Sequence, residues 1–109
     1  MPVVDVRSKA EFDRLLEAHA TLAIQAHATW CGPCRIISPI FEKLADGKQQ
    51  GEGDVAFARF DADEVADLAD ALKVRSIPTF FFYKDGQLKD KLAGPDPGAL
   101  TRAIDALAN

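Results

Sequence analysis

The chain has 109 residues, of which 48% are hydrophobic, 13 are basic and 17 are acidic, giving a formal net charge of −4. This length favours a single domain over residues 1–109, with a hydrophobic core that needs no disulfide staples. The acidic balance and the lack of a basic run argue against nucleic acid as a partner. No apolar stretch is long enough to predict a signal peptide or a membrane span, so we expect a cytoplasmic protein.

Hydrophobic periodicity predicts the element order β-α-β-α-β-α-β-β-α. The predicted strands are residues 3–6, 21–28, 55–60, 79–84 and 87–93. Helices are expected after Ser8, whose spacing to Glu11 matches a capping box, after Cys31, from near Asp63, and after the capping residue Asp96. Early alternation followed by a late hairpin predicts an α/β fold with a mixed five-stranded sheet and helices on both faces.

Several local features refine this outline. Pro39 falls inside the second helical pattern and is expected to bend that helix. Residues 47–54 are polar and glycine-rich, which predicts a loop, and Asp85-Gly86 predicts a hairpin turn. Acidic side chains near the third helix are expected to form a solvated helix start that complements its dipole: Asp61, Asp63, Glu64 and Asp67.

The stretch ATWCGPCR, residues 28–35, holds both cysteines and the only tryptophan of the chain. Cys31 is predicted at a strand-to-helix junction, where unpaired backbone N–H groups and the helix dipole favour a negatively charged thiolate. We expect a solvent-facing, nucleophilic Cys31, with Cys34 one turn further along on the inner side of the helix. Pro33 stiffens the turn, and its missing N–H does no harm in a first helical turn.

Three interpretations of this pair are open: a structural clip, half of a metal site, or a reversible redox couple. A disulfide across two intervening residues closes a small loop and removes little chain entropy. A zinc site generally needs four ligands, and beyond two thiols the chain offers only His19 and His27, from different predicted elements. A Cys-x-x-Cys within a βαβ pattern is typical of a redox motif. We expect no metal.

Motifs across nearly the whole chain carry a family resemblance. They are Trp30-Cys31-Gly32-Pro33-Cys34, the following ISPIFEKLA, Ile77-Pro78-Thr79, Asp85-Gly86 and Gly94. Together they resemble the thioredoxin family: its active-site motif, the helix after it, the loop holding a cis proline beside the cysteines, the hairpin turn and a late glycine. The stretches ATWCGPC and SPIFEKL are most similar to those of eukaryotic, fungal thioredoxins.

The resemblance implies a thioredoxin fold and a protein-disulfide reductase in which Cys31 attacks and Cys34 resolves the mixed disulfide. It implies no bound cofactor, with electrons arriving indirectly from NADPH through a thioredoxin reductase. The expected partners are that reductase and disulfide-containing proteins, and we expect a monomer. The residues expected to line the substrate groove are Trp30, Ile77, Pro78, Ala93 and Gly94.

Two positions beside the motif depart from the family pattern. Gln25 stands where thioredoxins carry a buried aspartate, and His27 stands where they carry an aromatic residue. Glutamine does not titrate, so our hypothesis is that Gln25 slows attack by Cys34 and weakens the activity. A second hypothesis makes His27 a substitute base; the alternative is that it merely fills the place of the aromatic ring.

Two rival functions follow from the same residues. A glutathione-linked or oxidising relative would share the chemistry, but oxidising relatives tend to have histidine between the cysteines where this chain has Gly32-Pro33. A thioredoxin-like docking subunit would bind partners through the groove without redox turnover. The departures at Gln25 and His27 keep the docking alternative open.

Overall fold

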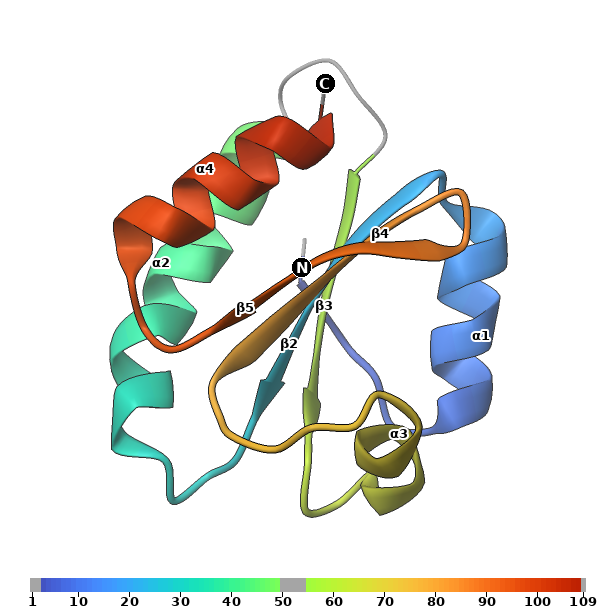
Figure 1. Cartoon of the computed structure of the whole chain (residues 1–109), viewed down its shortest axis with the longest axis vertical. Coiled ribbons are helices and arrows are strands. Elements are labelled where there is room, and N and C mark those ends of the chain that lie inside the picture. The colour runs from blue at the N-terminus through green and yellow to red at the C-terminus, as the bar shows by residue number, and fades with distance from the viewer. Residues whose placement is uncertain (1–2, 50–54, 109) are drawn as a thin grey trace.

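The structure, a computed structural model, describes residues 3–49 and 55–108. Its elements follow the predicted order (Figure 1). They are β1 (Val3–Asp5), α1 (Lys9–Ala18), β2 (Thr21–His27), α2 (Gly32–Gln49), β3 (Val55–Asp61), α3 (Ala66–Ala71), β4 (Thr79–Lys84), β5 (Gln87–Ala93) and α4 (Pro97–Ala108).

The strands form one mixed five-stranded sheet in the order β1-β3-β2-β4-β5. Strands β1 and β2 both run parallel to β3, whereas β4 is antiparallel to β2 and to β5. This confirms the predicted mixed sheet. Strand β2 lies at its centre and is buried along residues 21–26, as its continuous apolar run requires. The two cysteines follow the end of this central strand.

Helices cover both faces of the sheet, as predicted. Helices α2 and α4 lie on one face, and α1 and α3 lie on the other (Figure 1). Alternate residues of β2 serve the two layers: Ala23 packs on the α2 side, and Leu22 and Ile24 pack on the α1 side. Gln25 therefore faces α2 from within the core.

The predicted helix caps are present, with one difference. The Ser8 hydroxyl oxygen accepts the Glu11 N–H at 3.1 Å, and the Asp96 carboxylate caps the first turn of α4. The Glu11 carboxylate accepts the N–H of Arg7 at 3.2 Å rather than that of Ser8. The reciprocal half of the capping box thus closes one residue earlier than the pattern predicts.

Two predicted boundaries are wrong. Helix α2 continues to Gln49, so the loop predicted for residues 47–54 begins too early; residues 50–54 lie outside the described part of the chain. Helix α3 begins at Ala66 rather than near Asp63. The cause is the Asp61 carboxylate, which accepts the backbone N–H groups of Asp63 and Glu64 and so holds a turn. Pro39 does lie inside α2; the bend stays a prediction.

The hairpin between β4 and β5 turns at the predicted dipeptide. Asp85 and Gly86 have φ values of 53° and 79°, the left-handed pair that a tight hairpin turn demands. Consecutive residues Phe82 and Tyr83 lie opposite Asp90 and Leu88, so the strand β5 carries one extra residue, a β-bulge. No described helix is long and apolar enough to cross a membrane.

Candidate active site

The two cysteines are bonded to each other at the start of α2. Cys31 and Cys34 form a disulfide with their Cα atoms 5.3 Å apart. The backbone N–H of Cys34 donates a hydrogen bond to the Cys31 sulfur at 3.1 Å, and the N–H of Arg35 lies 3.4 Å from the Cys31 carbonyl oxygen. The first turn of the helix therefore aims a donor at Cys31, as a thiolate at this position requires. Gly32 and Pro33 are the exposed first residues of this turn.

Both sulfur-bearing side chains are covered in this disulfide form. Each cysteine is only 3% exposed, so the prediction of a solvent-facing Cys31 is wrong here, while the inner position of Cys34 is confirmed. The reason is packing: Ala28 from the end of β2 and Ile77 from a loop before β4 lie against the pair.

The loop before β4 brings the predicted groove residues to the cysteines. The Ile77–Pro78 peptide bond is cis, as the resemblance implies. The Pro78 carbonyl oxygen accepts the N–H of Gly94 at 2.9 Å, and Gly94 has a φ of 98°, a conformation that favours glycine. Ala93 is exposed and lies opposite Thr79, the first residue of β4. The structure thus joins the 77–78 loop, the end of β5 and the cysteine pair.

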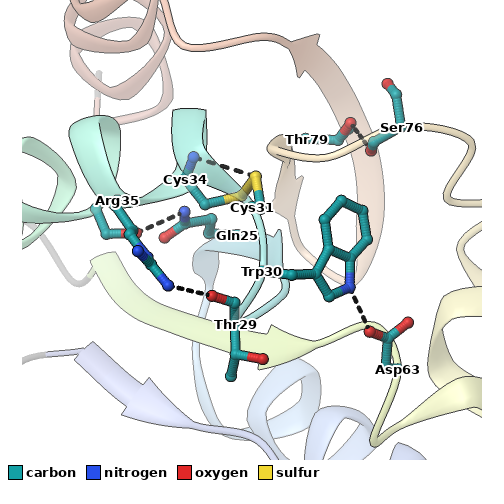
Figure 2. Close-up of a disulfide and its surroundings, with 10 residues drawn as sticks. Gln25, Thr29, Trp30, Cys31, Cys34, Arg35, Asp63, Ser76 and Thr79 are labelled. Carbon is teal, nitrogen blue, oxygen red and sulfur yellow. Dashed lines mark hydrogen bonds between the residues drawn. A yellow bond between two sulfur atoms is a disulfide. The ribbon is translucent and has the colours of Figure 1, made fainter.

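Trp30 is the exposed side chain beside the disulfide. Its side chain is 69% exposed, and its indole N–H donates to a carboxylate oxygen of Asp63 at 2.8 Å (Figure 2). On the other side of the loop, the Arg35 guanidinium donates to the Thr29 carbonyl oxygen at 2.9 Å. Hydrogen bonds from Trp30 to Asp63 and from Arg35 to Thr29 therefore fix the loop that precedes Cys31. The sequence analysis missed Asp63 and Arg35 as site residues.

Gln25 lies fully buried beneath the first turns of α2. Its side chain is 0% exposed, and its amide nitrogen donates to the Ser38 hydroxyl oxygen at 3.0 Å. Its neighbours across the sheet are Arg59 on β3 and Phe80 on β4. The Arg59 guanidinium is already bonded to Asp5 at 2.7 Å and to a carboxylate on α2 at 2.8 Å. A neutral amide thus occupies the position where the resemblance implies a carboxyl group.

His27 lies at the end of β2, opposite Asp61 of β3, and is partly buried. Burial is the largest influence and lowers the pKa of His27 below its ordinary 6.5; Asp61 opposes this shift, while Arg59 adds to it. The side chain lines a pocket of about 210 Å³ with Thr29 and Glu64 among the other lining residues. Within the described part of the chain, neither cysteine lines this pocket.

Around the pair, the described residues offer no ligand set for a metal. Among the described residues, no group of three or more histidine, cysteine, aspartate or glutamate side chains is arranged to hold a metal ion. The two thiols that a half metal site would use are instead bonded to each other. The geometry supports disulfide chemistry at Cys31 and Cys34.

Comparison with known proteins decides the family, because the thioredoxin family model matches residues 3–106. The chain belongs to the thioredoxin family. A thioredoxin from Coprinus comatus is 46% identical over 94 residues, covering 86% of this chain and 87% of that protein. The crystal structure of Malassezia sympodialis thioredoxin superposes with a TM-score of 0.88 at 35% identity, covering 98% of this chain and 91% of the other.

A third similar structure comes from work on a peroxiredoxin. A structure from work on the thiol-resolving mechanism of a yeast mitochondrial 1-Cys peroxiredoxin via glutathione and thioredoxin systems has a TM-score of 0.87 at 36% identity. It covers 95% of this chain and 94% of its own. The fold and the resemblance to eukaryotic, fungal-type thioredoxins are confirmed. This thioredoxin is a thiol-disulfide oxidoreductase, a protein-disulfide reductase with a redox-active Cys31–Cys34 pair.

Proposed function

We propose that Cys31 is the nucleophile of this thioredoxin and that Cys34 resolves the intermediate. The observation that carries this division is the hydrogen bond from the Cys34 backbone N–H to the Cys31 sulfur at 3.1 Å. A donor at a helix start stabilises a thiolate on the residue it faces, and the thiolate is the form that attacks a disulfide.

The proposed cycle moves two electrons to the substrate. The Cys31 thiolate attacks one sulfur of a substrate disulfide, forms a mixed disulfide and releases the other substrate sulfur as a thiolate. Cys34 then loses its proton, and its thiolate attacks the Cys31 sulfur. The Cys31–Cys34 bond forms, the mixed disulfide breaks, and the second substrate sulfur leaves and takes up a proton. The substrate is reduced, and the enzyme ends in the disulfide form seen here.

Electrons must then return to the enzyme. We propose that a thioredoxin reductase fed by NADPH reduces Cys31–Cys34, because the family works with such a partner and the cycle leaves the pair oxidised. The chain would act as a monomer in a reducing compartment, the cytoplasm, and residues 1–109 would form one domain. Its only two cysteines form the redox pair, which fits a protein that needs no structural disulfide.

Substrates are proposed to be disulfide-containing proteins, including peroxiredoxin-type partners like that of the relative described above. They would dock along a groove lined by Trp30, Ile77, Pro78, Ala93 and Gly94. The exposed indole, the Ile77 side chain over the cysteines and the Ala93–Gly94 backbone offer an apolar and main-chain surface for an extended peptide.

Gln25 is proposed to affect the rate rather than the type of reaction, and His27 is proposed to have no catalytic role. Gln25 has no titrating group to accept the Cys34 proton, so resolution should be slower than with a carboxylate there. His27 is the nearest alternative along β2, but its pocket adjoins Asp61 and Glu64. We therefore favour the hypothesis that His27 fills the place of an aromatic side chain.

Single-cysteine variants test the proposed roles. Cys34→Ser should trap a stable mixed disulfide between Cys31 and insulin, visible on a non-reducing gel, whereas Cys31→Ser should trap little. The reverse pattern would overturn the assignment. The double variant Cys31→Ser/Cys34→Ser separates the docking alternative, because a docking subunit keeps its function in cells that lack the wild-type protein, whereas a reductase loses it.

A further inference from the structure

Gln25 has one polar atom that the oxidised structure leaves unsatisfied. Among the described residues, its side-chain oxygen is the one buried side-chain nitrogen or oxygen without a hydrogen-bond partner. The side chain is 0% exposed, so bulk water does not reach it. Buried acceptors are almost always paired, because an unpaired one loses its hydrogen bonds to water and gains none from the protein. The question is which donor serves this oxygen.

The obvious donor on the neighbouring strand is directed elsewhere. Arg59 lies beside Gln25 in the sheet register, but its guanidinium donates to Asp5 and to Glu42 at 2.7 Å and 2.8 Å, and none of its N–H groups bonds to the Gln25 oxygen. The other neighbour across the sheet, Phe80, offers no side-chain donor. The remaining direction is toward α2.

On α2, Gln25 lies under the helix face that carries Cys34. The Gln25 amide nitrogen bonds to Ser38, which is four residues and therefore about one turn after Cys34. Side chains four residues apart project from the same helix face. In Figure 2 the Gln25 amide is drawn just below the Cys34 side chain. Cys34 is 3% exposed, so it too is shielded from solvent.

The chemistry of the pair explains the missing partner. A disulfide sulfur carries no hydrogen and donates nothing. Reduction by a partner dithiol breaks the Cys31–Cys34 bond with two electrons and oxidises the partner to a disulfide; of the partner's two protons, one goes to Cys34 and the other passes to solvent where Cys31 is a thiolate. Cys31 faces the helix-start N–H, which favours its thiolate, so the buried Cys34 is the sulfur that keeps its hydrogen. A thiol is a weak donor, and an amide oxygen is a good acceptor.

We propose that the Cys34 thiol donates a hydrogen bond to the Gln25 side-chain oxygen in the reduced protein only. Gln25 is then a positioning residue that responds to the redox state: its oxygen is unpaired in the disulfide form and paired in the dithiol form. It favours the dithiol form at equilibrium and holds the proton that Cys34 must lose to resolve a mixed disulfide. This inference rests on the resolving role proposed for Cys34.

The test compares the two redox states of Gln25→Met, which keeps the side-chain length and lacks the amide oxygen. The reduction equilibrium against glutathione should shift about threefold to tenfold toward the disulfide; a tenfold shift corresponds to about 30 mV. The thermal midpoint of the reduced form should fall more than that of the oxidised form. Equal losses in both forms, with an unchanged equilibrium, would mean that the amide only fills space.

Infrared spectroscopy tests the bond directly and without turnover. In Cys31→Ser, Cys34 is the only thiol, and its S–H stretching band should lie at lower frequency than that of free cysteine. Adding Gln25→Asn, which keeps an amide but shortens the reach, should move the band back; an unmoved band contradicts the proposal. If the Gln25 variants do not fold, the frequency of the Cys34 S–H band in Cys31→Ser, compared with that of free cysteine, decides the question alone. A failure of Cys34→Ser to trap insulin would instead refute the resolving role, independently of this band.

Discussion

The hydrogen bond between Trp30 and Asp63 predicts how the groove keeps its shape. Asp63→Ala removes the acceptor that holds the indole N–H at 2.8 Å. A bond to a charged group is worth about 1.5–3 kcal/mol when buried, but solvent screening of exposed partners reduces this to about 1 kcal/mol. The indole is 69% exposed, so we use the lower figure. Ordering a freed side chain again on docking should cost a similar amount, about 0.5–1.5 kcal/mol.

These values predict a rise in KM for insulin of about twofold to tenfold in Asp63→Ala, with kcat almost unchanged, because the cysteines are untouched. Since Trp30 is the only tryptophan, its fluorescence anisotropy reports the ring directly and should fall in the variant. Glu64→Gln is the matched control: it removes one adjacent negative charge and leaves the indole bond. If Glu64→Gln raises KM equally, charge rather than ring orientation is responsible, and the reasoning is refuted.

Three further predictions concern stability. Phe41→Ala should lower the free energy of unfolding by about 3–5 kcal/mol in denaturant titrations, because its fully buried ring contacts two others; a loss below about 1 kcal/mol would contradict this. Burial holds the pKa of His27 below 6.5, so the stability that depends on neutral His27 is present above pH 6.5 and is lost as the pH falls through the lowered value. His27→Phe should therefore show a smaller drop in thermal midpoint on acidification than the wild type. Parallel pH profiles of the two proteins would disprove this. The hydrogen bond from Arg59 holds the pKa of Asp5 below 3.8, so the stability from this ion pair is present above pH 3.8 and is lost as the pH falls through the lowered value. Arg59→Met should lower the free energy of unfolding by about 1 kcal/mol at neutral pH and by less in acid. An equal loss at both pH values would argue against the ion pair.

Element order and strand positions could be predicted because each strand carries its own periodicity and each turn its own residues. The start of α3 could not. The acidic residues from Asp61 onward suit a helix start by composition, but the Asp61 side chain competes for the N–H groups of Asp63 and Glu64 and delays the helix to Ala66. Such competition depends on side-chain geometry that spacing does not encode.

The site was predictable where chemistry is local and not where it depends on contacts across the fold. The spacing of Cys31 and Cys34, together with the family resemblance, predicted the redox pair that the structure shows as a disulfide. The bond from Trp30 to Asp63 joins residues that are 33 positions apart, and nothing in an acidic stretch marks which carboxylate will meet an indole. The cover over Cys31 was missed for the same reason, since Ile77 reaches it from a distant loop.

The bulge in β5 affects how readily this edge of the sheet can pair with another chain. Strand β5 is one of the two edge strands of the sheet, and its extra residue, Lys89, lies between Leu88 and Asp90, which pair with β4; Lys91 follows. An irregular, charged border gives a second extended chain a poor template for continuous ladder bonding. This edge of the sheet is therefore poorly suited to pairing with another strand, which disfavours edge-to-edge association.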